Sequence, residues 1–221
     1  MRPKQNSYKI ILLVFIGLIV TLALLLNDFM ILIFPLFLLI WMIFPNYVEE
    51  TDWSKNKSFI FYLITGTIVG LITELLAIFN NLKLPPEERV LFWPDPVIDM
   101  ILAIFYYIPI ALFAAIILHN YKMTEINVFI IGGIYGICTE QVFQILLSFN
   151  LIYWFYVFLV YGSFITIPYT IFKNRLNNFD LKEVNKLQSM ILLFIALLLG
   201  FFIGGFILMR IAWILLGLPL N

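Results

Sequence analysis

Charged side chains are scarce in this sequence: Asp, Glu, Lys and Arg together make up 12% of its 221 residues, whereas about a quarter is usual in a soluble domain. The 13 basic and 13 acidic residues cancel to a net charge of zero, which argues against nucleic acid as a partner. Only one cysteine, Cys138, and one histidine, His119, are present. The chain therefore forms no internal disulfide and cannot build a zinc cluster of Cys and His ligands. We predict no cofactor, and the sequence leaves the binding of another metal open.

Apolar residues take the place of the missing charges. The sequence is 63% hydrophobic and 18% aromatic, and Phe alone contributes 23 residues. A water-soluble core of this length cannot hide so much apolar surface, so the solvent must be lipid. The apolar runs are too long for transmembrane strands and lack their alternation. The predicted fold class is therefore an all-α, polytopic membrane bundle.

Seven apolar runs approach the roughly 20 residues that a spanning helix needs. We interpret residues 1–221 as one membrane domain, with an N-terminal hairpin (10–45) and a final span (189–210). The two helices of the hairpin are joined only by Asn27 and Asp28, and the second is short and contains Pro35. The seven predicted spans are 10–27, 29–45, 59–80, 97–118, 127–149, 152–172 and 189–210.

The loop charges predict an orientation in the cell membrane. A cytoplasmic N-terminus places ten basic residues inside and three outside, in agreement with the positive-inside rule. The outside three are Lys83, Arg89 and Arg210; those inside are Arg2, Lys4, Lys9, Lys55, Lys57, Lys122, Lys173, Arg175, Lys182 and Lys186. With seven spans, the C-terminus is then external. All five tryptophans also fall near predicted membrane boundaries, as an aromatic belt requires.

Two segments of the sequence resemble each other. "GTIVGLITE", residues 66–74, aligns with "GGIYGICTE", residues 132–140, and the helices that follow, 105–120 and 159–174, match in outline. Because one span separates the two segments, both run from inside to outside. We therefore predict a parallel repeat of a two-helix unit, residues 59–118 and 127–172. Repeats of this kind often form transport folds with a site at their interface.

Each repeated segment carries one stripe of a helix. Gly66, Gly70, Thr73 and Glu74 lie at i, i+4, i+7 and i+8, which is a single face, and Gly132, Gly136, Thr139 and Glu140 do the same. Glycines at this spacing let helix backbones approach closely in a bilayer. The sequence therefore aims the Thr and Glu side chains at a neighbouring helix. If spans 3 and 5 pack together, the two carboxyls lie within about 10 Å, one helix-to-helix spacing.

Glu74, Glu140 and Asp99 are the candidate site residues. An acid in the bilayer costs roughly 2.5–3.5 kcal/mol on insertion scales, so it is functional by default. Two adjacent acids there should share a proton or a cation. The structural alternative is that both glutamates are neutral and hydrogen-bond across helices. Asp99 either joins them or caps the start of its helix, and Arg210 either neutralises a carboxylate or extends to the headgroups.

Three functions remain open at this point. The first is transport, or proton or ion translocation, through Glu74 and Glu140. The second is an intramembrane enzyme that acts on a lipid or isoprenoid by acid–base chemistry, assisted by Asp99 or by Glu87 and Glu88. The third is a non-catalytic subunit whose glycine-rich faces contact a homo- or hetero-oligomeric partner. The expected partners are the bilayer and a small-molecule, ion or lipid substrate. The inner halves of spans 3 and 5 look dry, which counts against a path through the membrane.

Overall fold

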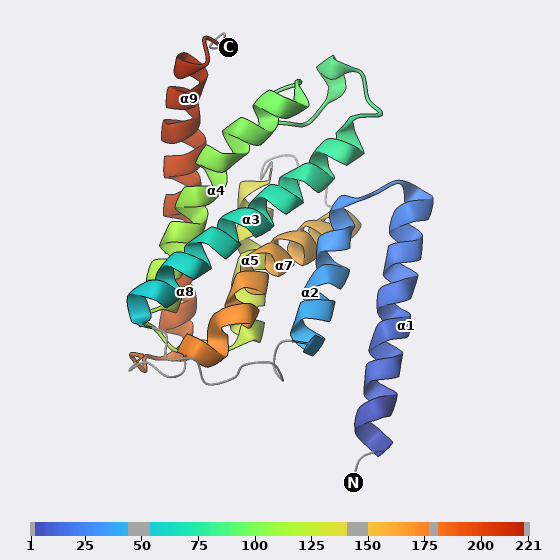
Figure 1. Cartoon of the computed structure of the whole chain (residues 1–221), viewed down its shortest axis with the longest axis vertical. Helices are drawn as coiled ribbons and strands as arrows, with labels where there is room; N and C mark the ends of the chain where they lie inside the picture. The colour runs from blue at the N-terminus through green and yellow to red at the C-terminus, as the bar shows by residue number, and fades with distance from the viewer. Residues whose placement is uncertain (1–2, 44–53, 141–149, 177–180, 219–221) are drawn as a thin grey trace.

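The computed structural model describes residues 3–43, 54–140, 150–176 and 181–218 (Figure 1). The secondary structure in these ranges is helical apart from one isolated bridge between Tyr121 and Lys182. The α-helices are α1 Pro3–Leu26, α2 Ile33–Ile43, α3 Lys55–Asn81, α4 Pro96–Leu118, α5 Glu125–Thr139, α7 Leu151–Leu176, α8 Lys186–Phe201 and α9 Met209–Leu215. Short 3₁₀ turns, η1 Met30–Leu32 and η3 Pro86–Glu88, lie between them.

Five helices are long and apolar enough to cross a membrane, which supports the prediction of a helical membrane bundle. They cover Tyr8–Leu26, Lys55–Asn81, Pro96–Leu118, Leu151–Lys173 and Lys186–Leu215. The other two predicted spans correspond to shorter apolar helices, Met30–Ile43 and Glu125–Thr139. Part of the predicted span 127–149 lies outside the described residues. The seven-span count, and the division into hairpin, repeats and final span, therefore stay predictions.

The last helix is longer than the sequence pattern indicated. α8 continues without a break through a π-helical segment, η4 Phe202–Leu208, into α9, which ends at Leu215. The helix thus extends beyond residue 210, where the predicted final span ends. Gly200 and Gly204 let this helix pack closely on α4, because a Cβ at either position would come within 2.7 Å of α4 backbone atoms.

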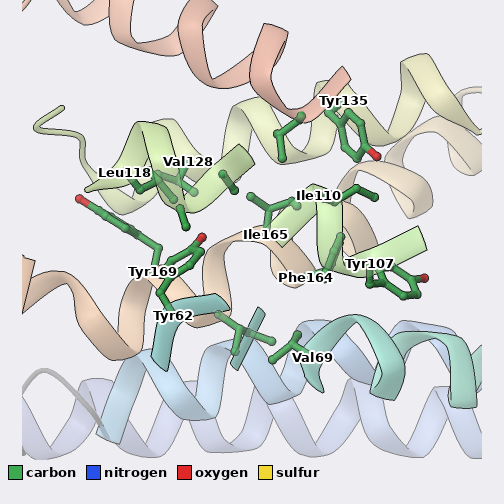
Figure 2. Packing of buried hydrophobic residues seen from close by; sticks show 14 of the residues in the cluster. Tyr62, Val69, Tyr107, Ile110, Leu118, Val128, Tyr135, Phe164, Ile165 and Tyr169 are labelled. Atoms are coloured by element: carbon green, nitrogen blue, oxygen red, sulfur yellow. The ribbon is translucent and has the colours of Figure 1, made fainter. Parts of the chain in front are cut away.

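Helix α4 lies near the centre of the bundle, packed on α3 and on α8, while α5 packs on α7. The buried apolar side chains between these helices form one continuous core. Figure 2 shows that Tyr107 lies at one end of this core and that Leu118, Val128 and Tyr169 lie at the other. α1 is peripheral, and its apolar side chains such as Ile11, Leu18 and Leu25 are exposed, as expected for a helix that faces lipid.

Local signals explain where the main helices begin. Ser54 accepts a hydrogen bond from the backbone N–H of Lys57 at the start of α3, and Thr124 accepts one from Asn127 at the start of α5. At the start of α4, the cap is Asp95, which accepts from the backbone N–H groups of Val97 and Ile98. The N-cap of α4 is therefore Asp95, and Asp99 lies in the first helical turn, where its carboxyl has other partners.

Candidate functional site

The glycine stripe of α3 is covered by α4. A Cβ at Gly70 would overlap the ring and Cβ of Tyr107, and a Cβ at Gly66 would lie 3.0 Å from the Cβ of Ala111. The nearest Tyr107 atom would lie 2.4 Å from the added Cβ at Gly70, so both approaches are shorter than the usual contact between side chains. The absence of a side chain at these two positions therefore allows α4 to lie directly on the α3 backbone.

The glycine stripe of α5 is covered by α7 in the same manner. A Cβ at Gly136 would overlap Tyr161, and one at Gly132 would lie 3.0 Å from the Cβ of Ile165. The covering residues are four apart in both cases, as Tyr107 and Ala111 are on α4. The principal neighbours of α3 are α4 and α7, and those of α5 are α7 and α8. The two stripes thus pack on different helices, not on each other as we had considered.

Each tyrosine that covers a glycine also holds a glutamate. The Tyr107 hydroxyl donates a hydrogen bond of 2.9 Å to Glu74 Oε2, and the Tyr161 hydroxyl donates one of 2.6 Å to Glu140 Oε2. The threonines of the stripes are not donors to these acids. The hydroxyl of Thr73 bonds to a carbonyl of its own helix at 2.9 Å, as threonine often does in membrane helices.

Glu74 lies among other acids. Its side chain is 7% exposed and interacts electrostatically with the carboxyls of both Asp99 and Glu140. Asp99 is fully buried, and its Oδ1 accepts a hydrogen bond of 3.0 Å from the backbone N–H of Trp93. Its other oxygen, Oδ2, has no hydrogen-bond partner in the described part of the chain. A proton on either Glu74 or Asp99 would let the two carboxyls hydrogen-bond to each other.

Glu74 and Glu140 line the same cavity, which has a volume of about 920 Å³. Its walls come from the ends of α1, α3 and α5, the beginning of α7, the middle of α4 and the α8–η4–α9 helix. Aromatic side chains form much of the wall: Phe92, Tyr106, Tyr107, Tyr153, Tyr156, Tyr161, Phe201 and Phe206.

Sequence reasoning missed a third acid in the cavity wall. Asp28 Oδ1 accepts hydrogen bonds of 2.8 Å from the Tyr156 hydroxyl and from the Asn80 side-chain amide. In the sequence, Asp28 belongs to the two-residue connection between the first two predicted helices, a position that is typical of a turn residue. Its partners lie 52 and 128 positions away, so no local pattern signals the contact. The cavity thus brings together three acids, each with a tyrosine donor.

Other residues that we considered do not reach the cavity wall. Arg210 is exposed, and so are Glu87 and Glu88, and none of the three lines the cavity. The position of Arg210 favours an interaction with lipid headgroups. Glu87 and Glu88 do not line the cavity, so the structure gives no support for their assistance in acid–base chemistry there. Gln141 and Gln144, near Glu140 in sequence, lie outside the described residues.

The glycine faces and the acids limit two further interpretations. The four stripe glycines are covered by helices of the same chain, so a partner that used these faces would have to displace them. Across the described ranges, no group of three or more His, Cys, Asp or Glu side chains is placed to hold a metal ion.

No family model, curated protein or solved structure matches this chain, so a functional inference rests on the site alone.

Proposed function

We propose that the chain is a membrane transport protein in which Glu74 and Glu140 form a protonatable site for solute or ion exchange. The observation that carries the proposal is that both carboxyls, supplied by different helix pairs, line one cavity. Ionisable groups inside a membrane protein commonly mark proton or substrate pathways. A purely structural hydrogen bond between helices would need neither the cavity nor a second acid.

The arrangement favours a change of protonation as the working step. Negative charges that lie close together in a poorly hydrated site repel each other, so they hold a proton or bind a cation. Asp99 extends the group behind Glu74, since its carboxyl lies within hydrogen-bond reach of the Glu74 carboxyl and the two can share a proton. The tyrosine donors would keep each glutamate in place in both its charged and its neutral state. Loss of a proton would then make the cavity attractive to a cation.

We also propose that the two half-sites arise from the internal repeat. In α3 and α4, Gly70, Tyr107 and Glu74 form one unit. Gly136, Tyr161 and Glu140 form the corresponding unit in α5 and α7. Two such units facing one cavity are what a two-helix repeat would supply, and transport proteins commonly place their site between repeats. Seven spans, a cytoplasmic N-terminus and an external C-terminus belong to the same proposal.

The test is proton movement in liposomes that contain the purified full-length chain. With an inward-directed proton gradient, we expect the wild-type protein to speed the decay of the gradient when a transported solute is present. The Glu74→Gln, Glu140→Gln double variant should lose this effect while folding normally. Glu88→Gln, which removes an exposed acid outside the cavity, is the matched control and should behave as wild type. Proton flux that survives the double substitution would refute the proposal.

A second candidate, an intramembrane enzyme for a lipid or isoprenoid, is favoured by the one-sided location of the cavity. Its lining residues come from the part of the bundle that holds the α3–α4 connection and the end of α9 (Figure 1). A transporter must also open towards the opposite end, whereas an enzyme needs only one entrance. Conversion of an added lipid without any transmembrane flux, lost in the same double variant, would favour the enzyme.

A further inference from the structure

We propose that the solute of this cavity is an organic cation with an apolar body, such as a quaternary ammonium or phosphonium ion. This inference rests on the proposed function, since it names the class of solute that would exchange with protons at Glu74 and Glu140. It is carried by four properties of the cavity: its charge, the buried Asp99 carboxyl beside it, its aromatic walls and its size.

The charge of the cavity wall is unbalanced. Asp28, Glu74 and Glu140 line it, and Lys83 is the basic residue among the described lining residues. The ammonium group of Lys83 donates to the backbone carbonyl of Asn27 at 2.9 Å. Both ion pairs found in the described ranges, Lys122–Glu183 and Lys173–Glu125, involve other acids. The cavity therefore favours a ligand that brings its own positive charge.

The buried carboxyl of Asp99, beside the cavity, also favours a positively charged ligand. Asp99 is fully buried, and its Oδ2 has no donor among the described residues unless a proton lies between it and the carboxyl of Glu74, which is within hydrogen-bond reach. Its carboxyl interacts with Glu74, which lines the cavity. A cation in the cavity would compete with the proton that this pair of carboxyls shares, so its binding should release a proton to the solvent.

The walls suit a large soft cation better than a metal ion. Metal ions such as Ca²⁺ need several oxygen ligands converging at about 2.3–2.6 Å, and no group of three acids in the described chain is placed to provide them. Each lining acid is instead held separately by its own tyrosine. The faces of tyrosine and phenylalanine rings attract organic cations, above all quaternary ammonium groups. Tyr153 and Tyr156, stacked with an interplanar angle of 13°, form one such surface.

The size of the cavity agrees with this class of solute. A volume of about 920 Å³ lies within the roughly 300–1,000 Å³ range of sites for drug-sized molecules. A hydrated or bare metal ion would leave most of this space unfilled. An apolar cation would instead place its body against the aromatic wall and its charge near the three carboxyls.

The experiment compares two ions of the same shape and opposite charge. Equilibrium binding of tetraphenylphosphonium and of tetraphenylborate is measured on the full-length protein in an uncharged detergent, with Na⁺ as competitor. We expect saturable binding of the phosphonium ion only, with release of protons and no competition by Na⁺. Replacing Glu74 and Glu140 by Gln should weaken it about tenfold or more, equivalent to about 1.4 kcal/mol, whereas Glu88→Gln should not.

Aromatic variants test the wall independently of the acids. Tyr153→Leu should weaken phosphonium binding several-fold, whereas Tyr153→Phe should retain it because the ring face remains. Phe202→Leu is the matched control, since Phe202 is an exposed aromatic residue outside the cavity wall. Equal binding of the borate ion, or an unchanged affinity in Tyr153→Leu, would overturn the inference.

The same measurements separate this inference from the proposed function. If Na⁺ releases protons from the wild-type protein but not from the double Gln variant, and the phosphonium ion does not bind, the exchange site stands and the organic-cation inference is wrong. If the phosphonium ion binds with the expected selectivity but no protons are released and no flux occurs, the solute class stands and proton exchange is wrong.

Discussion

Tyr107 and Glu74 form a hydrogen bond of 2.9 Å, and the same tyrosine lies over Gly70, one helical turn before the glutamate. Residues four apart share a face of a helix, so one ring can cover the glycine while its hydroxyl reaches the acid. Tyr161 does the same for Gly136 and Glu140. The position of each carboxyl therefore depends on a glycine that takes no part in its chemistry.

The first prediction concerns this dependence. Alanine normally stabilises a helix by about 1 kcal/mol relative to glycine. At Gly70 the added methyl group would overlap Tyr107, so we expect Gly70→Ala to lower stability by about 1–3 kcal/mol through overpacking. Thermal unfolding in detergent measures the effect, and Gly136→Ala should behave alike.

Gly17 provides the matched control for these substitutions. It also lies within a helix, but a Cβ there would meet no atom within 4 Å. Gly17→Ala should therefore leave stability unchanged or raise it slightly. Equal effects at Gly17 and Gly70 would show that the contact with Tyr107 is not tight.

The second prediction concerns the hydrogen bond itself. In a double-mutant cycle of Tyr107→Phe and Glu74→Gln, we expect a coupling energy between about 0.6 kcal/mol, the average for hydrogen bonds between membrane helices, and about 1.7 kcal/mol, the maximum. The cycle of Tyr161→Phe with Glu140→Gln should give a similar value. Unfolding by a denaturing detergent supplies the free energies. Tyr107→Phe combined with Glu88→Gln should show no coupling, and a coupling as large as that with Glu74 would contradict the assignment.

The stripe of glycine, threonine and glutamate could be predicted because its positions follow directly from helix periodicity. The helix that covers the stripe could not. That choice depends on Tyr107 and Tyr161, which lie 33 and 21 residues after the acids they hold, and an aromatic residue in an apolar run gives no sign of its partner. Asp28 was missed for the same reason.

Helix ends were also only partly predictable. Both Asp95 and Asp99 precede or open an apolar run, and composition does not say which one is the cap. The structure selects Asp95 because Pro96 takes the first helical position, where proline fits best. α5 ends at Thr139, inside the predicted span 127–149, and residues 141–149 of that span lie outside the described part of the chain.

The third prediction concerns pH and His119, the first residue after the apolar helix α4. Its side chain is 1% exposed, and its ring centroid lies 5.4 Å from that of Phe59 and 5.5 Å from that of Tyr62. Burial lowers the pKa of the imidazole from its usual value. The backbone of Ala115, whose carbonyl is 3.0 Å from Nδ1, and that of Ser58 act in the opposite direction, and Lys55 adds a smaller lowering effect. The folded protein therefore keeps this histidine neutral at pH values where the unfolded chain binds a proton.

The sign of the effect follows from this difference. Below about pH 6.5, the ordinary pKa of histidine, the unfolded state gains a proton that the folded state does not, so acidification destabilises the fold until the folded pKa is reached. Wild-type protein should thus lose more thermal stability than His119→Gln between about pH 7.5 and about pH 5.5. All other titratable groups are common to both proteins. Equal losses of stability would mean that His119 binds a proton as readily in the folded state as in the unfolded state.

The last prediction concerns orientation. α1 begins at one end of the molecule and α9 ends at the other (Figure 1), as an odd number of spans requires. From the ten-to-three bias of basic residues, we predict that the N-terminus lies in the cytoplasm and the C-terminus outside. A reporter that is active only outside the cell should work when fused after Asn221, and one that is active only in the cytoplasm should not. A third fusion, placed after Asn120 in the α4–α5 connection, should be cytoplasmic. A cytoplasmic signal at Asn221 would mean that the number of spans is even and that the seven-span prediction is wrong. The side of the membrane on which the cavity lined by Asp28, Glu74 and Glu140 opens would then have to be assigned again.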